Sequence, residues 1–109
     1  MATNFKNKVG ANIGTTPVTL ITAGESSKIT IIGFTLTNLT EGIVVASVTV
    51  TDDTATTGHF IKNVPIPPNQ SLRIVNGGEK LIIAPSNSVA VVANQSSALD
   101  VIVSYVEIT

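Results

Sequence analysis

Apolar and polar side chains alternate with a period of two along most of this chain, which is the spacing of a β-strand with one buried face. Residues 44–50 show the pattern most clearly, with valine or alanine at every even position. Similar short runs occupy residues 9–13, 18–21, 28–38, 59–66, 72–75, 80–84, 88–93 and 99–108. No stretch keeps the 3.6-residue period of a helix over three turns. Eight or nine short strands separated by glycine, proline and asparagine turns predict an all-β protein, an antiparallel β-sandwich that is jelly-roll-like.

One predicted strand changes the parity of its apolar positions part-way along. Ile29 and Ile31 lie on one parity, whereas Phe34 and Leu36 lie on the other. A glycine at such a phase change is typical of a β-bulge, in which one extra residue re-aims the side chains that follow. We therefore predict a bulge at Gly33. A bend of this kind is one way in which a sandwich strand passes from one sheet edge to the other.

The segment 64–68 contains three prolines, which lack an N–H and cannot lie inside a central sheet ladder. It predicts an edge strand followed by a corner where the chain turns. Two short β-type runs follow, at 72–75 and 80–84, and the residues between them, 76–79, have the sequence NGGE. Because glycine readily accepts the positive φ of hairpin turns, we predict that these two runs form a β-hairpin.

The last run, residues 99–108, is apolar on both parities, with valine, leucine, isoleucine or tyrosine facing each way. A strand of this kind is expected to be central and covered on both faces. In a domain of two sheets, a second subunit can supply the outer cover. The sequence therefore predicts contact with another polypeptide along this strand.

The composition supports the same expectation. Hydrophobic residues make up 43% of the 109 residues and charged residues only 12%, against about a quarter in typical domains. We expect a single domain over residues 9–109, preceded by a polar arm at residues 1–8, and a homo-oligomer or a part of a larger assembly. The alternative is a monomer with a threonine-rich surface. Phe5 in the arm either folds back onto the core or reaches a neighbouring subunit.

Charge and hydropathy exclude several kinds of partner. The net charge is −1 and the six lysines and arginines are scattered singly, so no nucleic-acid partner is expected. No apolar run approaches the roughly 20 residues of a membrane helix, so no membrane partner is expected either. Residues 1–8 lack the apolar core of a signal peptide, and we expect synthesis in the cytoplasm.

The sequence offers no candidate catalytic, cofactor-binding or metal-binding residues. His59 is the one histidine, there is no cysteine, and no Gly-x-Ser-x-Gly elbow is present, so we do not expect an enzyme. Asp52 and Asp53 lack further carboxylates at the fixed spacing that a Ca²⁺ site needs. They belong to a polar loop, Asp52 to Gly58, which we expect at an exposed tip. The aromatic side chains are all expected in the core, namely Phe5, Phe34, Phe60 and Tyr105.

Several segments together carry a resemblance to a known family. They are GTTPVT at 14–19, IGFTLTN at 32–38, VPIP at 64–67, GGEKL at 77–81 and the terminal VEIT at 106–109. With these segments, nearly the whole chain resembles the small β-sandwich virion structural proteins of tailed bacteriophages, of the type found in phages of cyanobacteria and marine bacteria. The resemblance implies a non-enzymatic protein that joins the virion in many copies and needs no cofactor.

The leading hypothesis is a capsid decoration (cement) protein, a homo-oligomer and most simply a trimer, bound to the major capsid protein. The alternative within the same class is a tail, neck or fibre component that contacts tail or neck proteins. An alternative from another class is a cell-surface or carbohydrate-binding module that uses loops such as residues 52–58. Sedimentation separates these classes, because the binding module is expected to be a monomer.

Overall fold

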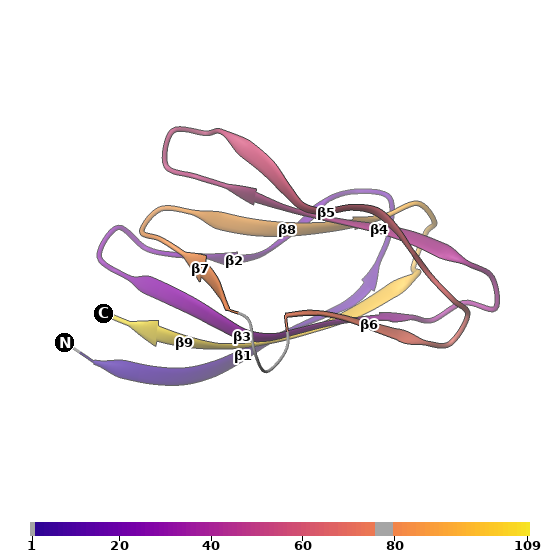
Figure 1. Ribbon diagram of the computed structural model, residues 1–109, viewed down its shortest axis with the longest axis horizontal. Helices are drawn as coiled ribbons and strands as arrows, with labels where there is room; N and C mark the ends of the chain where they lie inside the picture. Colours follow the sequence, from indigo (N-terminus) through magenta and orange to yellow (C-terminus); the bar gives the residue numbers. More distant parts are fainter. Residues whose placement is uncertain (1, 76–79) are drawn as a thin grey trace.

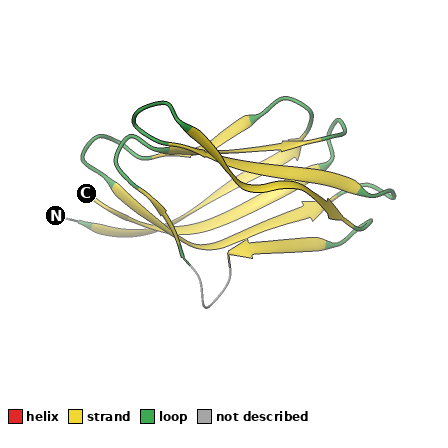
Figure 2. Ribbon diagram, turned by 45° about the horizontal axis from the view of Figure 1, so that its top comes forward, coloured by secondary structure: helices red, strands yellow, loops and turns green. Residues whose placement is uncertain are grey.

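The computed structural model describes residues 2–75 and 80–109, which form nine strands in two facing antiparallel sheets (Figure 1). The described residues contain only strands, turns and loops, arranged as two layers (Figure 2). This confirms the predicted β-sandwich. The strands are β1 (Thr3–Ile13), β2 (Val18–Thr22), β3 (Lys28–Asn38), β4 (Val44–Thr51), β5 (Thr57–Ile66), β6 (Ser71–Val75), β7 (Leu81–Ile83), β8 (Ser88–Ala93) and β9 (Leu99–Ile108).

The strand pairs are nested around the loop between β4 and β5. One sheet has the order β1-β9-β3-β6, with β7 also on β3, and the other has the order β2-β8-β4-β5. Moving outward from the β4–β5 pair, β3 pairs with β6 and β7, β2 with β8, and β1 with β9. Successive pairs alternate between the two sheets, which is the winding of a jelly roll. The two ends meet: the Ala2 N–H donates to the Thr109 carbonyl, and the Thr109 N–H to the Ala2 carbonyl.

The core lies between the sheets and follows the period-two pattern of the sequence. Alternate residues of β3, β4, β8 and β9 are buried, whereas most of their neighbours are partly or fully exposed. Burying apolar surface contributes about 25 cal/mol per Å². The largest fully buried side chains are Phe34, Ile29, Ile31, Leu36, Ile66, Ile83 and Leu99, followed by five valines.

The predicted bulge in β3 is confirmed, and its extra residue is Ile32. Ile31 lies opposite Tyr105 of β9 and Gly33 lies opposite Ser104, so Ile32 has no partner in the register. Ile31 and Phe34 are both fully buried, whereas Ile32 is 41% exposed. The bulge thus keeps both halves of the strand facing the core. It does not carry β3 into the other sheet, because β3 pairs with β9 along nearly its whole length.

The proline-rich segment also behaves as predicted. Pro65 lies in the edge strand β5, opposite Val45 of β4, where its missing N–H removes no bond from the interior of the sheet. The chain then turns, with the Gln70 N–H donating to the Pro67 carbonyl and Asn69 at a positive φ of 56°. After this corner it enters β6 of the other sheet.

The predicted hairpin between β6 and β7 is wrong. Val75 of β6 lies opposite Phe34, and Leu81 of β7 lies opposite Ile31, so both strands run antiparallel to β3. They follow one another along the same edge of β3 and occupy the place of one strand. The predicted turn at residues 76–79 lies outside the described residues. Both strands find their hydrogen-bonding partner in β3, because this eleven-residue strand is long enough to pair with β7 along one half and with β6 along the other.

The predicted arm at residues 1–8 also differs from the structure. From Thr3 onward these residues belong to β1, which pairs with β9 from Thr3 opposite Ile108 to Gly10 opposite Val101 without a register shift. The strand extends this far because β9 offers a ladder of matching length. Phe5 does not fold onto the core, since it is 79% exposed.

The other aromatic residues divide in the same way. Phe34 is fully buried and Tyr105 packs against the core, as predicted, whereas Phe60 of the edge strand β5 is 37% exposed. Phe60 fails the prediction because it is the extra residue at a register shift: Ile61 lies opposite Val48 and His59 opposite Thr49, so Phe60 has no partner in the ladder.

Asn38 joins the two sheets at the proline corner. It ends β3 and is 1% exposed, and its Nδ2 donates to the carbonyls of Ile66 (2.9 Å), Pro67 (3.2 Å) and Gly42 (2.8 Å). Its Oδ1 accepts from both the N–H and the hydroxyl of Thr40, each at 2.8 Å. Every polar atom of this buried side chain therefore has a partner, which offsets the cost of burying it.

Candidate interaction surface

The histidine and the aspartates that were weighed for catalysis and metal binding lie on β5 and in the loop before it. His59 lies exposed on the edge strand β5, opposite Thr49 of β4. Across residues 2–75 and 80–109, no group of three or more histidine, aspartate or glutamate side chains could hold a metal ion. Over the same residues, no helix is long and apolar enough to cross a membrane.

The loop from Asp52 lies at an exposed tip, as predicted, and is closed by its own side chains. The Asp52 carboxylate accepts hydrogen bonds from the Thr54 hydroxyl (2.7 Å), the Thr54 N–H (2.9 Å) and the Thr56 N–H (3.0 Å). These bonds, the Thr54 hydroxyl foremost, lower the pKa of Asp52 because they stabilise its charged form. The carboxylate is thus engaged in holding the turn.

Ala55 in this loop offers a direct test of the backbone. It has a positive φ of 65°, where a Cβ costs about 1–2 kcal/mol. After allowance for the greater freedom of glycine when unfolded, Ala55→Gly is expected to increase the free energy of unfolding by about 0.5–1 kcal/mol. Urea denaturation measures the change. Ala11→Gly in β1, at an ordinary φ, is the matched control and is expected to decrease the same quantity.

The outward side of the five-stranded sheet carries apolar side chains in rows that cross the strands. We call this side the outer face. In one row, Phe5 of β1 lies opposite Val106 of β9, Val106 opposite Thr30 of β3, and Thr30 opposite Ile82 of β7. Phe5 is 79% exposed and Ile82 58% exposed. Ile32, the unpaired residue of the bulge, is 41% exposed and adds a further apolar side chain beside this row.

A second row lies four residues further along the strands, a distance of about 13 Å. Val9 of β1 lies opposite Ile102 of β9, and Ile102 lies opposite Thr35 of β3. Val9 is 60% exposed and Ile102 53% exposed. Val9, Ile102 and Thr35 are all uncharged. The row ends on β6 with Arg73, which lies opposite Thr35.

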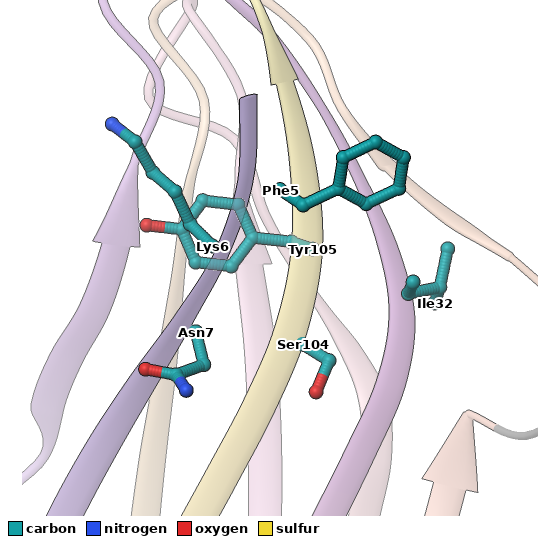
Figure 3. Close-up of a pocket in the computed structure, with 6 residues that line it drawn as sticks. All are labelled: Phe5, Lys6, Asn7, Ile32, Ser104 and Tyr105. Carbon is teal, nitrogen blue, oxygen red and sulfur yellow. The ribbon is translucent and has the colours of Figure 1, made fainter. Parts of the chain in front are cut away.

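Small side chains separate the two rows. Asn7 of β1 lies opposite Ser104 of β9, which lies opposite Gly33 of β3. The result is a shallow open depression of about 550 Å³ at the margin of the outer face. Figure 3 shows the Phe5 ring extending over β9 towards Ile32 of β3, with the Ser104 side chain between β9 and β3. The face therefore presents two apolar ridges with a low, polar strip between them.

An ion pair lies at the β1 margin. The Lys6 ammonium donates to the Glu107 carboxylate, with 2.6 Å between Nζ and Oε1. The hydrogen bond and the nearby negative charge of Glu107 raise the pKa of Lys6. Because solvent screens such an exposed pair, it contributes little to stability. The pair shows that a lysine of β1 can bind a carboxylate on a neighbouring strand.

The sequence revealed part of this surface. Residues 99–108 do form a central strand, as the apolar character of both parities predicted, and Ile102 is the outward residue that the isolated chain leaves uncovered. The contributions of Phe5, Val9 and Ile82 were missed. Only the register that aligns β1 and β7 with β9 and β3 brings these residues into rows.

Comparisons with known proteins add a likeness at the level of structure only. No protein-family model and no curated protein matches the sequence. The fold is similar to a chain in the crystal structure of the T13 IBDV viral particle, with a TM-score of 0.49, 12% identity, and coverage of 96% of this chain and 35% of that chain. It is also similar to a chain in the structure of infectious bursal disease virus Gt strain, with a TM-score of 0.47, 11% identity, and coverage of 97% and 32%. This chain therefore spans about a third of the length of each.

Proposed function

We propose that this chain is a non-enzymatic structural protein of a bacteriophage virion, a capsid decoration (cement) protein that joins the particle in many copies. The observation that carries the proposal is the outer face, where Phe5, Val9, Ile82 and Ile102 are each more than half exposed. Large apolar surfaces on soluble domains are typically covered by a partner. The family resemblance of the sequence supports the same role.

The size of the surface favours assembly in many copies. Fully burying one large apolar side chain contributes about 1.5–3 kcal/mol, and these four side chains are 53–79% exposed, so covering them contributes roughly 4–8 kcal/mol. Association of two proteins costs about 4–15 kcal/mol in lost freedom of motion and ordering. A single contact through this face is therefore weak, whereas several contacts within an oligomer on a symmetric lattice reinforce one another.

The mechanism is stabilisation by mass action. A protein that binds the assembled shell, and does not bind separated capsid subunits, increases the free energy needed to open the shell. A rigid sheet suits this role because little order is lost on binding. A tail, neck or fibre component would use the same face in the same way and differs only in its place on the particle.

The oligomer is tested by sedimentation of the isolated protein. We expect a defined homo-oligomer, and we expect Ile102→Lys to weaken it at least about tenfold, because the substitution places a charge in an apolar contact. Ile43→Lys is the matched control, since Ile43 is 60% exposed but lies between β3 and β4, outside the outer face. A monomeric wild-type protein at high concentration contradicts the homo-oligomer and favours the simple binding-module alternative.

The place on the virion is tested with purified particles of the phage that encodes the chain. We expect density for this protein on the outside of the capsid, and particles that lack it are expected to open at a lower temperature. Adding the purified protein back should restore the opening temperature. Density on the tail or neck selects that alternative, and absence of the protein from purified particles overturns the virion proposal.

A further inference from the structure

The outermost strand of the five-stranded sheet, β1, has a regular edge along which no strand of residues 2–75 and 80–109 pairs. β1 bonds to β9 on one side and is the end of the strand order. Thr3 to Val9 are all exposed. An edge of this kind presents a row of backbone donors and acceptors to which a further strand can be added.

The other edge strands have features that hinder such addition. β5 contains Pro65 and two register shifts, and β2 is five residues long with a register shift of its own. β6 and β7 have five and three residues. By contrast, β1 keeps one register from Thr3 to Gly10. Prolines, bulges and shortness protect natural sheet edges, and β1 lacks these three over this stretch. Its protection is charge, from Lys6 and Lys8, which repel a strand that brings further positive charge.

Charge indicates what β1 can accept. Lys6 and Lys8 project from one side of the strand and Phe5 and Val9 from the other, since their positions differ in parity. Two copies of β1 paired about a two-fold axis at Asn7 would place Lys6 opposite Lys8. An axis at either lysine would place that lysine opposite itself, and like charges directly opposite are destabilising. Self-pairing of β1 in these three registers is therefore unfavourable.

The strand that already pairs with β1 shows which chemistry fits. β9 places Val106 and Ile108 on the side of Phe5, and Glu107 on the side of Lys6, where the carboxylate meets the ammonium at 2.6 Å. We propose that the free edge of β1 binds an extended segment of another protein in which acidic and apolar residues alternate. The backbone supplies the ladder, Lys8 attracts a carboxylate of the added strand while Lys6 is already paired with Glu107, and the outer face accepts the apolar side chains. This surface goes beyond the proposed function, because it does not depend on where the chain resides.

The test uses a short synthetic peptide in which glutamate alternates with valine, titrated into the full-length chain and followed by NMR of the backbone amides. We expect shift changes concentrated in residues 3–9 and an affinity that decreases as salt increases. Lys8→Gln is expected to weaken binding about threefold, and Lys8→Arg is expected to preserve it. Lys62→Gln on the edge strand β5 is the matched control and should leave binding unchanged.

Three results overturn the inference: no binding of the glutamate peptide, equal binding of a peptide with lysine in place of glutamate, or shift changes at the edges of β2 or β5 instead of β1. None of these bears on the presence of the chain in virions. Likewise, a chain that is absent from purified particles but binds the peptide through β1 refutes the proposed function and leaves this inference intact.

Discussion

Replacing Asn38 with aspartate is expected to destabilise the protein by an amount that grows with pH. The new carboxyl oxygen would face the carbonyls of Gly42, Ile66 and Pro67, which now accept bonds from Nδ2. Loss of those donors costs about 1–3 kcal/mol even with a neutral side chain. Burial among three carbonyl oxygens also disfavours the charged form, so the pKa of the new carboxyl is raised in the folded state.

The sign of the pH dependence follows from this raised pKa. Below about pH 4 the carboxyl is protonated in both the folded and the unfolded state, and stability does not depend on it. Above that pH the unfolded state releases the proton while the folded state keeps it, so stability falls by about 1.4 kcal/mol per pH unit. If the folded carboxyl stays protonated to pH 7, the added cost reaches about 4 kcal/mol, a large part of a typical stability of about 5–15 kcal/mol.

Urea unfolding between pH 4 and 7 measures this effect. Asn94→Asp is the matched control, because the Asn94 Oδ1 accepts a bond from the Val45 N–H (2.9 Å), and a carboxylate oxygen can accept the same bond. We expect the control to change stability by less than about 0.5 kcal/mol. An Asn38→Asp variant whose loss of stability is the same at pH 4 and pH 7 would contradict the proposed environment of the side chain.

Deleting Ile32 is expected to abolish cooperative folding. Without the extra residue, the two halves of β3 can no longer face the core together, because a slip of one residue moves a strand's side chains to the opposite face. Either Ile29 and Ile31 or Phe34 and Leu36 would turn outward, and each such pair represents about 3–6 kcal/mol of burial. The polar residues that would enter the core increase the cost further.

The control for the deletion is Ile32→Thr, which removes the apolar side chain and keeps the residue count. Ile32 is 41% exposed and has no register partner, so we expect this variant to fold with a cooperative urea transition close to that of the wild type. Circular dichroism and the dispersion of NMR signals distinguish the two variants. A deletion variant with a wild-type transition would show that the bulge does not set the phase of β3.

The features that the sequence predicted are those set by local chemistry. The alternation in residues 44–50, the phase change beside Gly33 and the prolines of 64–68 each act within a few residues, and each appears in the structure where it was expected. The jelly-roll winding was also predicted, since many short antiparallel strands with frequent turns admit few compact arrangements.

The features that the sequence missed depend on partners distant in the chain. A glycine-rich segment between two short strands is compatible with a hairpin and equally with two strands in tandem, and only the length of β3 decides between them. Residues 3–8 are polar enough to suggest an arm, but β9 holds them in a ladder. Nothing in the sequence singled out Asn38, because its carbonyl partners include Ile66 and Pro67, 28 and 29 residues away.

The paired backbones of Ala2 and Thr109 have a consequence for how this fold can be combined with others. Because the two ends of the sandwich are adjacent, the fold could be inserted into a surface loop of another protein with little distortion of that loop. Neighbouring termini of this kind favour domain insertion. Any cargo fused to either end would project from the same corner of the molecule.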